Sequence, residues 1–143
     1  MNEYDVKVLK VVDGDTVDVD IDLGFGIVLT DERVRIMGID TPESRTSDKV
    51  EKIFGLAAKD RLKELLGETA ILITHEDKNG EDMKGKFGRV LGDFRVGGKT
   101  VTEILIEEGH AVAYHGQSKD DVQDAHMTNR QRLIAEGKVS LEG

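Results

Sequence analysis

The chain has 143 residues, of which 38% are hydrophobic and 34% are charged. This length fits one ordinary packed domain and leaves no room for two, so we expect a single domain over residues 1–143. Cysteine is absent, which excludes disulfides and thiolate chemistry. The formal net charge of −9 argues against a protein that coats nucleic acid nonspecifically.

The charge is distributed unevenly along the chain. Residues 1–32 hold nine acidic residues and two lysines, whereas residues 84–99 hold five basic residues and one acidic residue. Because a net charge can hide a local site of the opposite sign, the composition leaves the nature of the partner open.

The first residues show neither the cationic nor the apolar segment of a signal peptide, and no apolar run approaches the roughly 20 residues of a membrane span. We therefore expect no membrane partner, and we expect a monomer. Two locations stay open: an intracellular protein, such as one encoded by a phage, or the mature fragment of a secreted protein.

The first third of the chain predicts strands. Residues 6–12 are rich in β-branched side chains and predict a strand, which ends at the turn 13–15. Aspartate then alternates with aliphatic residues over 17–23, the period of a half-buried strand. Residues 23–26 predict a hairpin tip, and 27–39 predict a returning strand that Pro42 ends.

The rest of the chain alternates helices and strands. The apolar spacing predicts a helix over 50–66, stopped by Gly67, and a strand over 69–75. A polar turn over 77–85 leads to a strand over 87–96 and a turn at Gly97-Gly98. Thr100 and Glu103 predict a capping box and a short helix to Glu108. A short extended segment over 110–115 precedes a helix over 119–136, with a weak inner face formed by Val122, Ala125, His126, Leu133 and Ile134.

Connections this short do not allow parallel crossovers, so the element order predicts an α+β fold, mainly β. The expected architecture is a small barrel, such as an OB-fold, with helices packed outside.

Three segments concentrate carboxylates and arginines at predicted strand ends. They are Asp13-Gly14-Asp15-Thr16, the run from Arg35 to Glu43, and Lys86-Phe87-Gly88-Arg89. If the strand is regular, Arg35, Met37 and Ile39 share one face, and Ile36, Gly38 and Asp40 share the other. Pro42 then breaks the strand and allows the carboxylates of Asp40 and Glu43 to turn toward a common point.

Two neighbouring carboxylates repel each other unless a cation lies between them. Oxygen ligands without cysteine favour a hard cation such as Ca²⁺ or Mg²⁺, and nearby arginines suit a phosphate, which they can hold with two hydrogen bonds. Metal, phosphate and a spare carboxylate together indicate phosphodiester hydrolysis.

These three segments, in this order, resemble the signature of the staphylococcal nuclease family, and the resemblance covers residues 6–115. It implies an OB-type barrel of five strands with three helices. It implies one Ca²⁺ ion held by the side chains of Asp15 and Asp40 and by the backbone carbonyl of Thr41, with Asp13 outside the ligand set.

The same resemblance implies the catalytic roles. Glu43 would act as general base or position the attacking water, and Arg35 and Arg89 would bind the scissile phosphate. The expected substrates are DNA and RNA, preferably single-stranded, with 3′-phosphate ends as products. Lys86, Phe87 and Tyr114 would contact the substrate. The family pattern has an aromatic residue where Phe87 stands, and it is a tyrosine in the best-known member. The hairpin over 17–34 is longer than usual.

Asp18, Asp20 and Asp22 do not form an EF-hand, because Leu23 stands where that loop needs glycine and Leu29 where it needs glutamate. The four histidines lack metal-site spacing, so we expect them at the surface or hydrogen-bonded in the core. A catalytically weak or inactive nucleic-acid- or protein-binding module is the competing function. A structural or small-molecule-binding OB domain would leave the cluster of charged residues unexplained.

Overall fold

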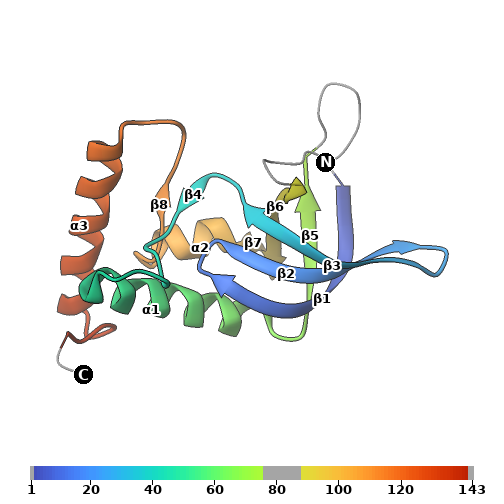
Figure 1. The fold of residues 1–143 in the computed structure, drawn as a ribbon, viewed down its shortest axis with the longest axis horizontal. Helices are drawn as coiled ribbons and strands as arrows, with labels where there is room; N and C mark the ends of the chain where they lie inside the picture. Colours follow the sequence, from blue (N-terminus) through green and yellow to red (C-terminus); the bar gives the residue numbers. More distant parts are fainter. Residues whose placement is uncertain (1, 76–87, 142–143) are drawn as a thin grey trace.

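The computed structural model describes residues 2–75 and 88–141, and its five long strands form a barrel (Figure 1). These strands are β1 (Asn2–Asp13), β2 (Thr16–Gly24), β3 (Ile27–Ile36), β5 (Thr69–Thr74) and β6 (Val90–Val96). They lie in the order β3-β2-β1-β5-β6, and a parallel pairing of β3 with β6 at Val34 and Val90 closes the sheet. The expected five-stranded barrel is confirmed.

Three helices and three two-residue strands complete the described part of the chain. They are β4 (Ile39–Asp40), α1 (Lys49–Leu66), β7 (Lys99–Thr100), α2 (Val101–Glu107), β8 (Val112–Ala113) and α3 (Lys119–Ala135). None of the helices in this part of the chain combines the length and the apolar character needed to cross a membrane.

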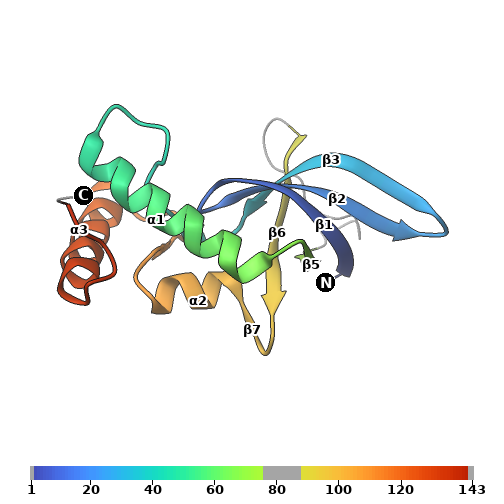
Figure 2. The same ribbon diagram turned by 90° about the horizontal axis from the view of Figure 1, so that it is seen from below.

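The alternation along β2 produces the core. Val17, Val19 and Ile21 are buried inside the barrel, while Asp18 and Asp20 face outward and are partly exposed. Helix α1 runs along one open side of the barrel (Figure 2) and adds Leu62 to the same apolar cluster. Phe94, Leu72 and Leu105 belong to the same cluster, so one core holds the barrel and two helices together.

Helices α1 and α2 each begin at a cap formed by a short polar side chain. The Asp48 carboxylate accepts from the backbone N–H groups of Val50 and Glu51, at 3.0 and 3.1 Å, and begins α1. The Thr100 hydroxyl accepts from the backbone N–H of Glu103 at 3.3 Å and begins α2. The predicted short helix and its threonine cap are confirmed.

The predicted regular strand over 27–39 is wrong at its end. Strand β3 stops at Ile36, the chain turns through Met37 and Gly38, and Gly38 adopts a φ of +81°. Ile36 and Ile39 are therefore both buried, although a regular strand would place them on opposite faces. After the turn, Ile39 and Asp40 pair with Ala113 and Val112 of β8.

The strand predicted over 87–96 begins later than expected. Strand β6 starts at Val90, because Gly88 has a φ of +73° and interrupts the extended backbone before it. The polar turn predicted over 77–85 lies outside the described residues.

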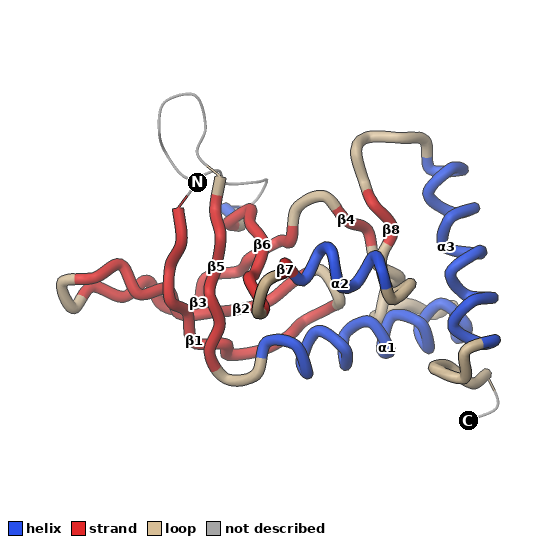
Figure 3. Tube along the Cα trace, turned by 180° about the vertical axis from the view of Figure 1, so that it is seen from behind, coloured by secondary structure: helices blue, strands red, loops and turns tan. Residues whose placement is uncertain are grey.

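The β2–β3 hairpin projects from the barrel, and α3 stands at the opposite end of the molecule (Figures 1 and 3). Phe25 at the hairpin tip is fully exposed, as predicted for a turn. On α3, His126 and Leu133 are buried as expected, but Ile134 is 42% exposed. The predicted buried face of α3 therefore included too many residues. Leu133 packs with Phe54 and Val139 in a small second cluster, to which Ile134 does not belong.

Candidate functional site

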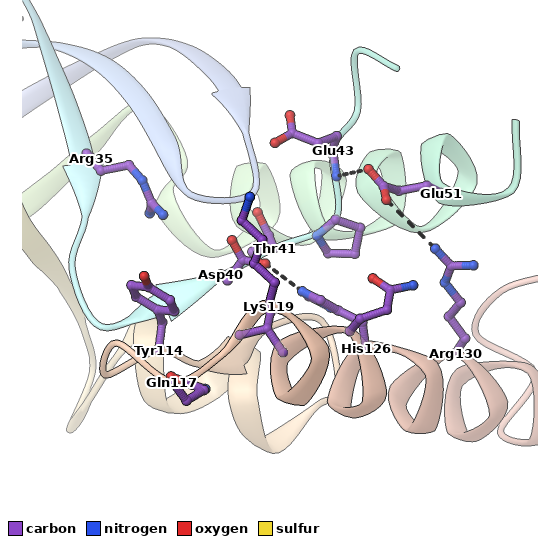
Figure 4. Close-up of a pocket in the computed structure, with 13 residues that line it drawn as sticks. Arg35, Asp40, Thr41, Glu43, Glu51, Tyr114, Gln117, Lys119, His126 and Arg130 are labelled. Carbon is purple, nitrogen blue, oxygen red and sulfur yellow. Dashed lines mark hydrogen bonds and ion pairs between the residues drawn. The ribbon is translucent and has the colours of Figure 1, made fainter. Parts of the chain in front are cut away.

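A pocket of about 460 Å³ lies between the rim of the barrel and α3 (Figure 4). The end of β3, the segment after β4, the start of α1, the segment after β8 and α3 all contribute side chains. The pocket is lined by Arg35, Asp40, Thr41, Pro42, Glu43, Glu51, Tyr114, Gln117, Lys119, Val122, Gln123, His126 and Arg130. Five residues expected at the site, Arg35, Asp40, Thr41, Glu43 and Tyr114, thus lie around one cavity.

The turn between β1 and β2 places Asp15 beside this pocket. Gly14 packs so closely that an added Cβ would lie 2.9 Å from the Cβ of Ala58 and 3.1 Å from a methyl of Thr41. Only glycine fits there without displacing α1 or the Thr41 segment. The carbonyl of Asp15 accepts from the N–H of Ile36 at 2.8 Å, and its carboxylate lies 3.4 Å from Nη2 of Arg35.

Backbone carbonyls hold the guanidinium of Arg35. Nη1 donates to the carbonyl of Ile36 at 2.6 Å, and Nη2 donates to the carbonyl of Ile39 at 3.1 Å. Both acceptors belong to the turn around Gly38, so the unpredicted end of β3 is what fixes the arginine. Because a guanidinium has five N–H donors, it keeps others for an anion in the pocket.

Asp40 is held from the opposite side by a residue of α3. Nε2 of His126 lies 2.7 Å from Oδ2 of Asp40 (Figure 4). An ionised carboxylate only accepts hydrogen bonds, so Nε2 carries the proton in this contact. The His126 side chain is 9% exposed, whereas that of Asp40 is 40% exposed. His126 was expected at the surface or hydrogen-bonded in the core, and its place at the pocket was missed.

Glu43 is crowded by other carboxylates. Partial burial raises the pKa of its side chain, and repulsion from Asp13, Asp15, Glu51 and Asp40 raises it further. The backbone N–H of Glu43 donates to Oε2 of Glu51 at 3.3 Å. Its carbonyl lies directly against α1, where a Cβ on Gly55 would come within 2.2 Å of it. This arrangement concentrates negative charge that a cation would neutralise.

The donors beside Arg35 are those of a hard cation. Asp15 and Asp40 supply carboxylate oxygens, and Thr41 is buried with a hydroxyl that no described protein atom partners. Within the described residues, no three histidine, aspartate or glutamate side chains are gathered tightly enough to enclose a metal ion by themselves. A cation here would need backbone carbonyl and water oxygens as well, which Ca²⁺ accepts in its six to eight ligands. The residues present therefore fit such an ion.

Arg89 does not line the same pocket as Arg35. It lines a neighbouring hollow on the outer side of the barrel rim, together with Asp13, Arg33 and Arg45. The two hollows adjoin, because Asp13 accepts a hydrogen bond from the Ser44 hydroxyl next to Glu43. The pairing of Val34 with Val90 keeps Arg89 at the same end of the barrel as Arg35. Lys86 and Phe87 lie outside the described residues.

Tyr114 occupies the rim of the pocket and is 49% exposed. Its N–H donates to the carbonyl of Gly38 at 2.9 Å, so the same turn that holds Arg35 also places this aromatic ring. An exposed ring at this position can stack on a nucleobase.

The pocket also holds charged residues that sequence reasoning missed. Arg130 lies 4.0 Å from Oε1 of Glu51 and over the ring of Phe54, 5.3 Å from its centroid. His126 and Arg130 are four residues apart, a spacing that places both on one face of a helix. That spacing is the signal in the sequence that could have pointed to a shared face. It does not identify Asp40 and Glu51 as the partners, because these residues lie far away in the sequence.

Comparison with known proteins identifies relatives of the whole barrel. Residues 33–141 match the family model described as Staphylococcal nuclease homologue. The chain is 35% identical to the SPbeta prophage-derived endonuclease YokF of Bacillus subtilis over 96% of its length, which is 43% of that protein. The chain is 30% identical to the thermonuclease of Staphylococcus hyicus, in an alignment that covers 78% of this chain and 60% of that protein. It is 35% identical to the endonuclease YncB of Bacillus subtilis, in an alignment that covers 73% of this chain and 46% of that protein. The chain thus spans less than two thirds of the length of each of these relatives.

Proposed function

The chain belongs to the staphylococcal nuclease family, and we propose that it is a Ca²⁺-dependent nuclease that hydrolyses phosphodiester bonds in DNA and RNA. The observation that supports this most directly is the meeting of Arg35 with the carboxylates of Asp15, Asp40 and Glu43 beside one cavity. Two of the relatives are named endonucleases and one a thermonuclease, which favours the same chemistry. Single strands are the proposed preferred substrate, and 3′-phosphate ends the proposed product.

Asp15 and Asp40 would hold the Ca²⁺ ion with their carboxylates, and Thr41 with its backbone carbonyl. When bound, the ion would supply positive charge that polarises the phosphate and offsets the negative charge of the pocket. The carboxylates that raise the pKa of Glu43 support a cation at this place, because the contact of Arg35 with Asp15 leaves enough repulsion to raise that pKa.

Glu43 is proposed as the group that accepts a proton from the attacking water. Its raised pKa makes its carboxylate a better proton acceptor than an ordinary glutamate at neutral pH. Water would attack the phosphorus while the bond to the leaving 5′ oxygen breaks. The proton of the attacking water would pass to the Glu43 carboxylate, and the leaving 5′ oxygen would take a proton from solvent.

Arg35 is proposed to bind the phosphate and to stabilise charge on its oxygens in the transition state. Its hydrogen bonds to Ile36 and Ile39 fix the guanidinium before substrate binds, so little reorganisation is needed during the reaction. Arg89 would approach the same phosphate from the adjoining hollow. Tyr114 would stack on a base, and Lys86 and Phe87 are proposed as further substrate contacts.

The test is a cleavage assay on single-stranded DNA. We expect cleavage with Ca²⁺, none with excess chelator, and recovery when Ca²⁺ is restored; replacement of Ca²⁺ by Mg²⁺ tests the choice of ion. End-labelling of the products identifies the 3′-phosphate. A protein that binds the oligonucleotide but does not cleave it with Ca²⁺ would instead be the noncatalytic binding module.

A further inference from the structure

We infer that His126 is a positioning residue, which holds the carboxylate of Asp40 through Oδ2 and so leaves Oδ1 free for the cation. The inference rests on the proposed function, because it is the proposed function that makes Asp40 a ligand of the cation. It assigns to α3, which lies outside the three sequence motifs, a direct part in forming the metal site.

The contact has the geometry of a strong hydrogen bond. The Nε2–Oδ2 distance is 2.7 Å, within the range of bonds that an ionised acceptor shortens. His126 is buried, whereas Asp40 is partly exposed at the pocket. The histidine is therefore the fixed partner and the aspartate the group that is oriented.

Asp40 has little else to hold it. It lies on β4, a strand of two residues that pairs only with the two residues of β8. No other hydrogen bond or ion pair to its carboxylate is found among the described residues. Without His126, the side chain could rotate about both of its torsions, and a carboxylate that must be ordered on binding binds a cation less tightly.

Packing alone does not explain a histidine at this position. The apolar contacts of α3 centre on Leu133, two turns further along the helix, with Phe54 and Val139. Around His126 the helix presents Val122, Gln123 and Arg130 to the pocket. His126 also lines a small cavity with Phe54 and Leu133, but those apolar neighbours give its ring nitrogens no hydrogen-bond partner. A buried imidazole costs free energy unless its polar atoms are hydrogen-bonded, and the carboxylate of Asp40 provides a bond.

Arg130 repeats the arrangement one turn later. It lies 4.0 Å from Oε1 of Glu51, whose other oxygen accepts from the backbone N–H of Glu43. One face of α3 therefore reaches both carboxylate segments, Asp40 directly and Glu43 through Glu51 (Figure 4). Groups that hydrogen-bond to a metal-binding carboxylate commonly change metal affinity or activity about 10–100-fold when they are removed.

The experiment compares three variants of the whole chain. His126→Phe keeps a ring of similar size without a donor, and His126→Gln keeps an N–H donor without the ring. His110→Phe is the control for loss of a buried histidine, because His110 is equally buried, at 7% against 8% exposed, and lines a small cavity beside His126. Among the described residues, no hydrogen bond or ion pair joins His110 to Asp40. Ca²⁺ is titrated without nucleic acid and followed by the backbone amide resonances of Asp40, Thr41 and Glu43. Urea unfolding measures the stability of each variant, and cleavage rates are measured over a range of Ca²⁺.

We expect His126→Phe to weaken Ca²⁺ binding about 10–100-fold and to raise the half-saturating Ca²⁺ for cleavage by the same factor. Saturating Ca²⁺ should restore most of kcat. His126→Gln should recover part of the affinity, and His110→Phe should keep the wild-type affinity whatever stability it loses. Unchanged Ca²⁺ affinity in a folded His126→Phe protein would overturn the inference while leaving the proposed function intact. A wild-type protein that neither binds Ca²⁺ nor cleaves would overturn the proposed function.

A second measurement does not depend on metal or on the folding of the His126 variants. In the Asp40→Asn protein, the ring nitrogen resonances of His126 should shift because its charged acceptor is gone, while those of His110 stay in place. Unshifted His126 resonances would show that the contact is not made, and would overturn the inference.

Discussion

The β2–β3 hairpin and the pocket are both rich in aspartate, yet their carboxylates are arranged in opposite ways. In the hairpin each of the three aspartates of β2 has its own partner. Asp18 pairs with Arg33 at 2.8 and 3.1 Å, Asp20 accepts from the N–H of Asp31 at 2.8 Å, and Asp22 accepts from the N–H of Gly24 at 2.8 Å.

In the pocket the carboxylates share one environment. Asp15, Asp40 and Glu51 come from separate segments, and together with Asp13 and partial burial they raise the pKa of Glu43. Aspartates at alternate positions of one strand are spread along its outer face, where solvent and single partners satisfy them. Segments distant in sequence can instead direct their carboxylates toward one point, and a cation is what we propose to complete this cluster. The density of acidic residues in the sequence is thus a poorer indication of a site than their convergence.

The largest effect is expected from the two arginines of β3. Arg33 and Arg35 lie two residues apart and each pairs with an aspartate, but only Arg35 lines the pocket. Arg35→Ala should lower kcat about 10²–10³-fold, the usual result of removing a donor to a developing oxyanion. Arg33→Ala should leave kcat near the wild-type value. Cleavage rates at saturating Ca²⁺ and substrate provide the measurement, and equal losses in the two variants would contradict the distinction between the two regions.

A second pair of variants compares the aspartates themselves. Asp40→Asn should raise the Ca²⁺ needed for half-maximal cleavage at least about tenfold, since loss of a ligand should cost no less than loss of the groups around it. Asp20→Asn keeps an oxygen that can accept from Asp31 and should leave the Ca²⁺ requirement unchanged. Rates measured over a Ca²⁺ series test both. If Asp20→Asn shifted the requirement as far as Asp40→Asn, the hairpin would have to be part of the cation site.

Much of this contrast was available in the sequence. The strict alternation of Val17, Val19 and Ile21 with aspartate predicts an outward-facing acidic row, and the structure has one. The Thr100 cap was also predicted from a local pattern. Both predictions were possible because the period of a strand and the cap of a helix depend on residues close together in the sequence.

The pocket was predicted as a set of residues but not as a geometry. The turn at Gly38, which holds Arg35 and Tyr114, requires a positive φ. A glycine in the sequence does not predict such a turn, because many glycines can adopt a positive φ but do not. The contact of His126 with Asp40 joins residues 86 positions apart, and the weak apolar pattern of α3 does not indicate where that helix packs. Only the tertiary arrangement decides such contacts.

The hairpin should act at a distance, through its charge. Asp20→Asn with Asp22→Asn removes two negative charges and keeps both hydrogen-bond acceptors. We expect a lower KM for single-stranded DNA at low salt, an effect that disappears as salt shortens the Debye length from about 10 Å at 0.1 M to about 3 Å at 1 M. The wild-type KM should depend only weakly on salt, because its acidic surface reduces long-range attraction to a polyanion. Steady-state kinetics over a salt series measure both, and a change in kcat would place the hairpin in the reaction instead.

The smallest effect concerns Glu108, a carboxylate outside both regions. Nε and Nη2 of Arg61 donate to its two oxygens at 2.6 and 2.9 Å, and this contact lowers the pKa of Glu108 below its ordinary 4.5, the opposite of the shift at Glu43. A lowered pKa in the folded state stabilises the protein above the ordinary pKa, and this stability is lost as pH falls through the folded-state value. The pair is partly exposed, so Glu108→Gln should cost only about 0.2–1 kcal/mol in the free energy of unfolding at neutral pH, and nothing once Glu108 is protonated. Urea unfolding of both proteins along a falling pH series measures this difference. If the two proteins still differed in free energy of unfolding at acid pH, the contact of Arg61 with Glu108 would stabilise by packing and not by charge. Glu108 would then not be comparable with the hairpin aspartates, each of which accepts hydrogen bonds from one partner.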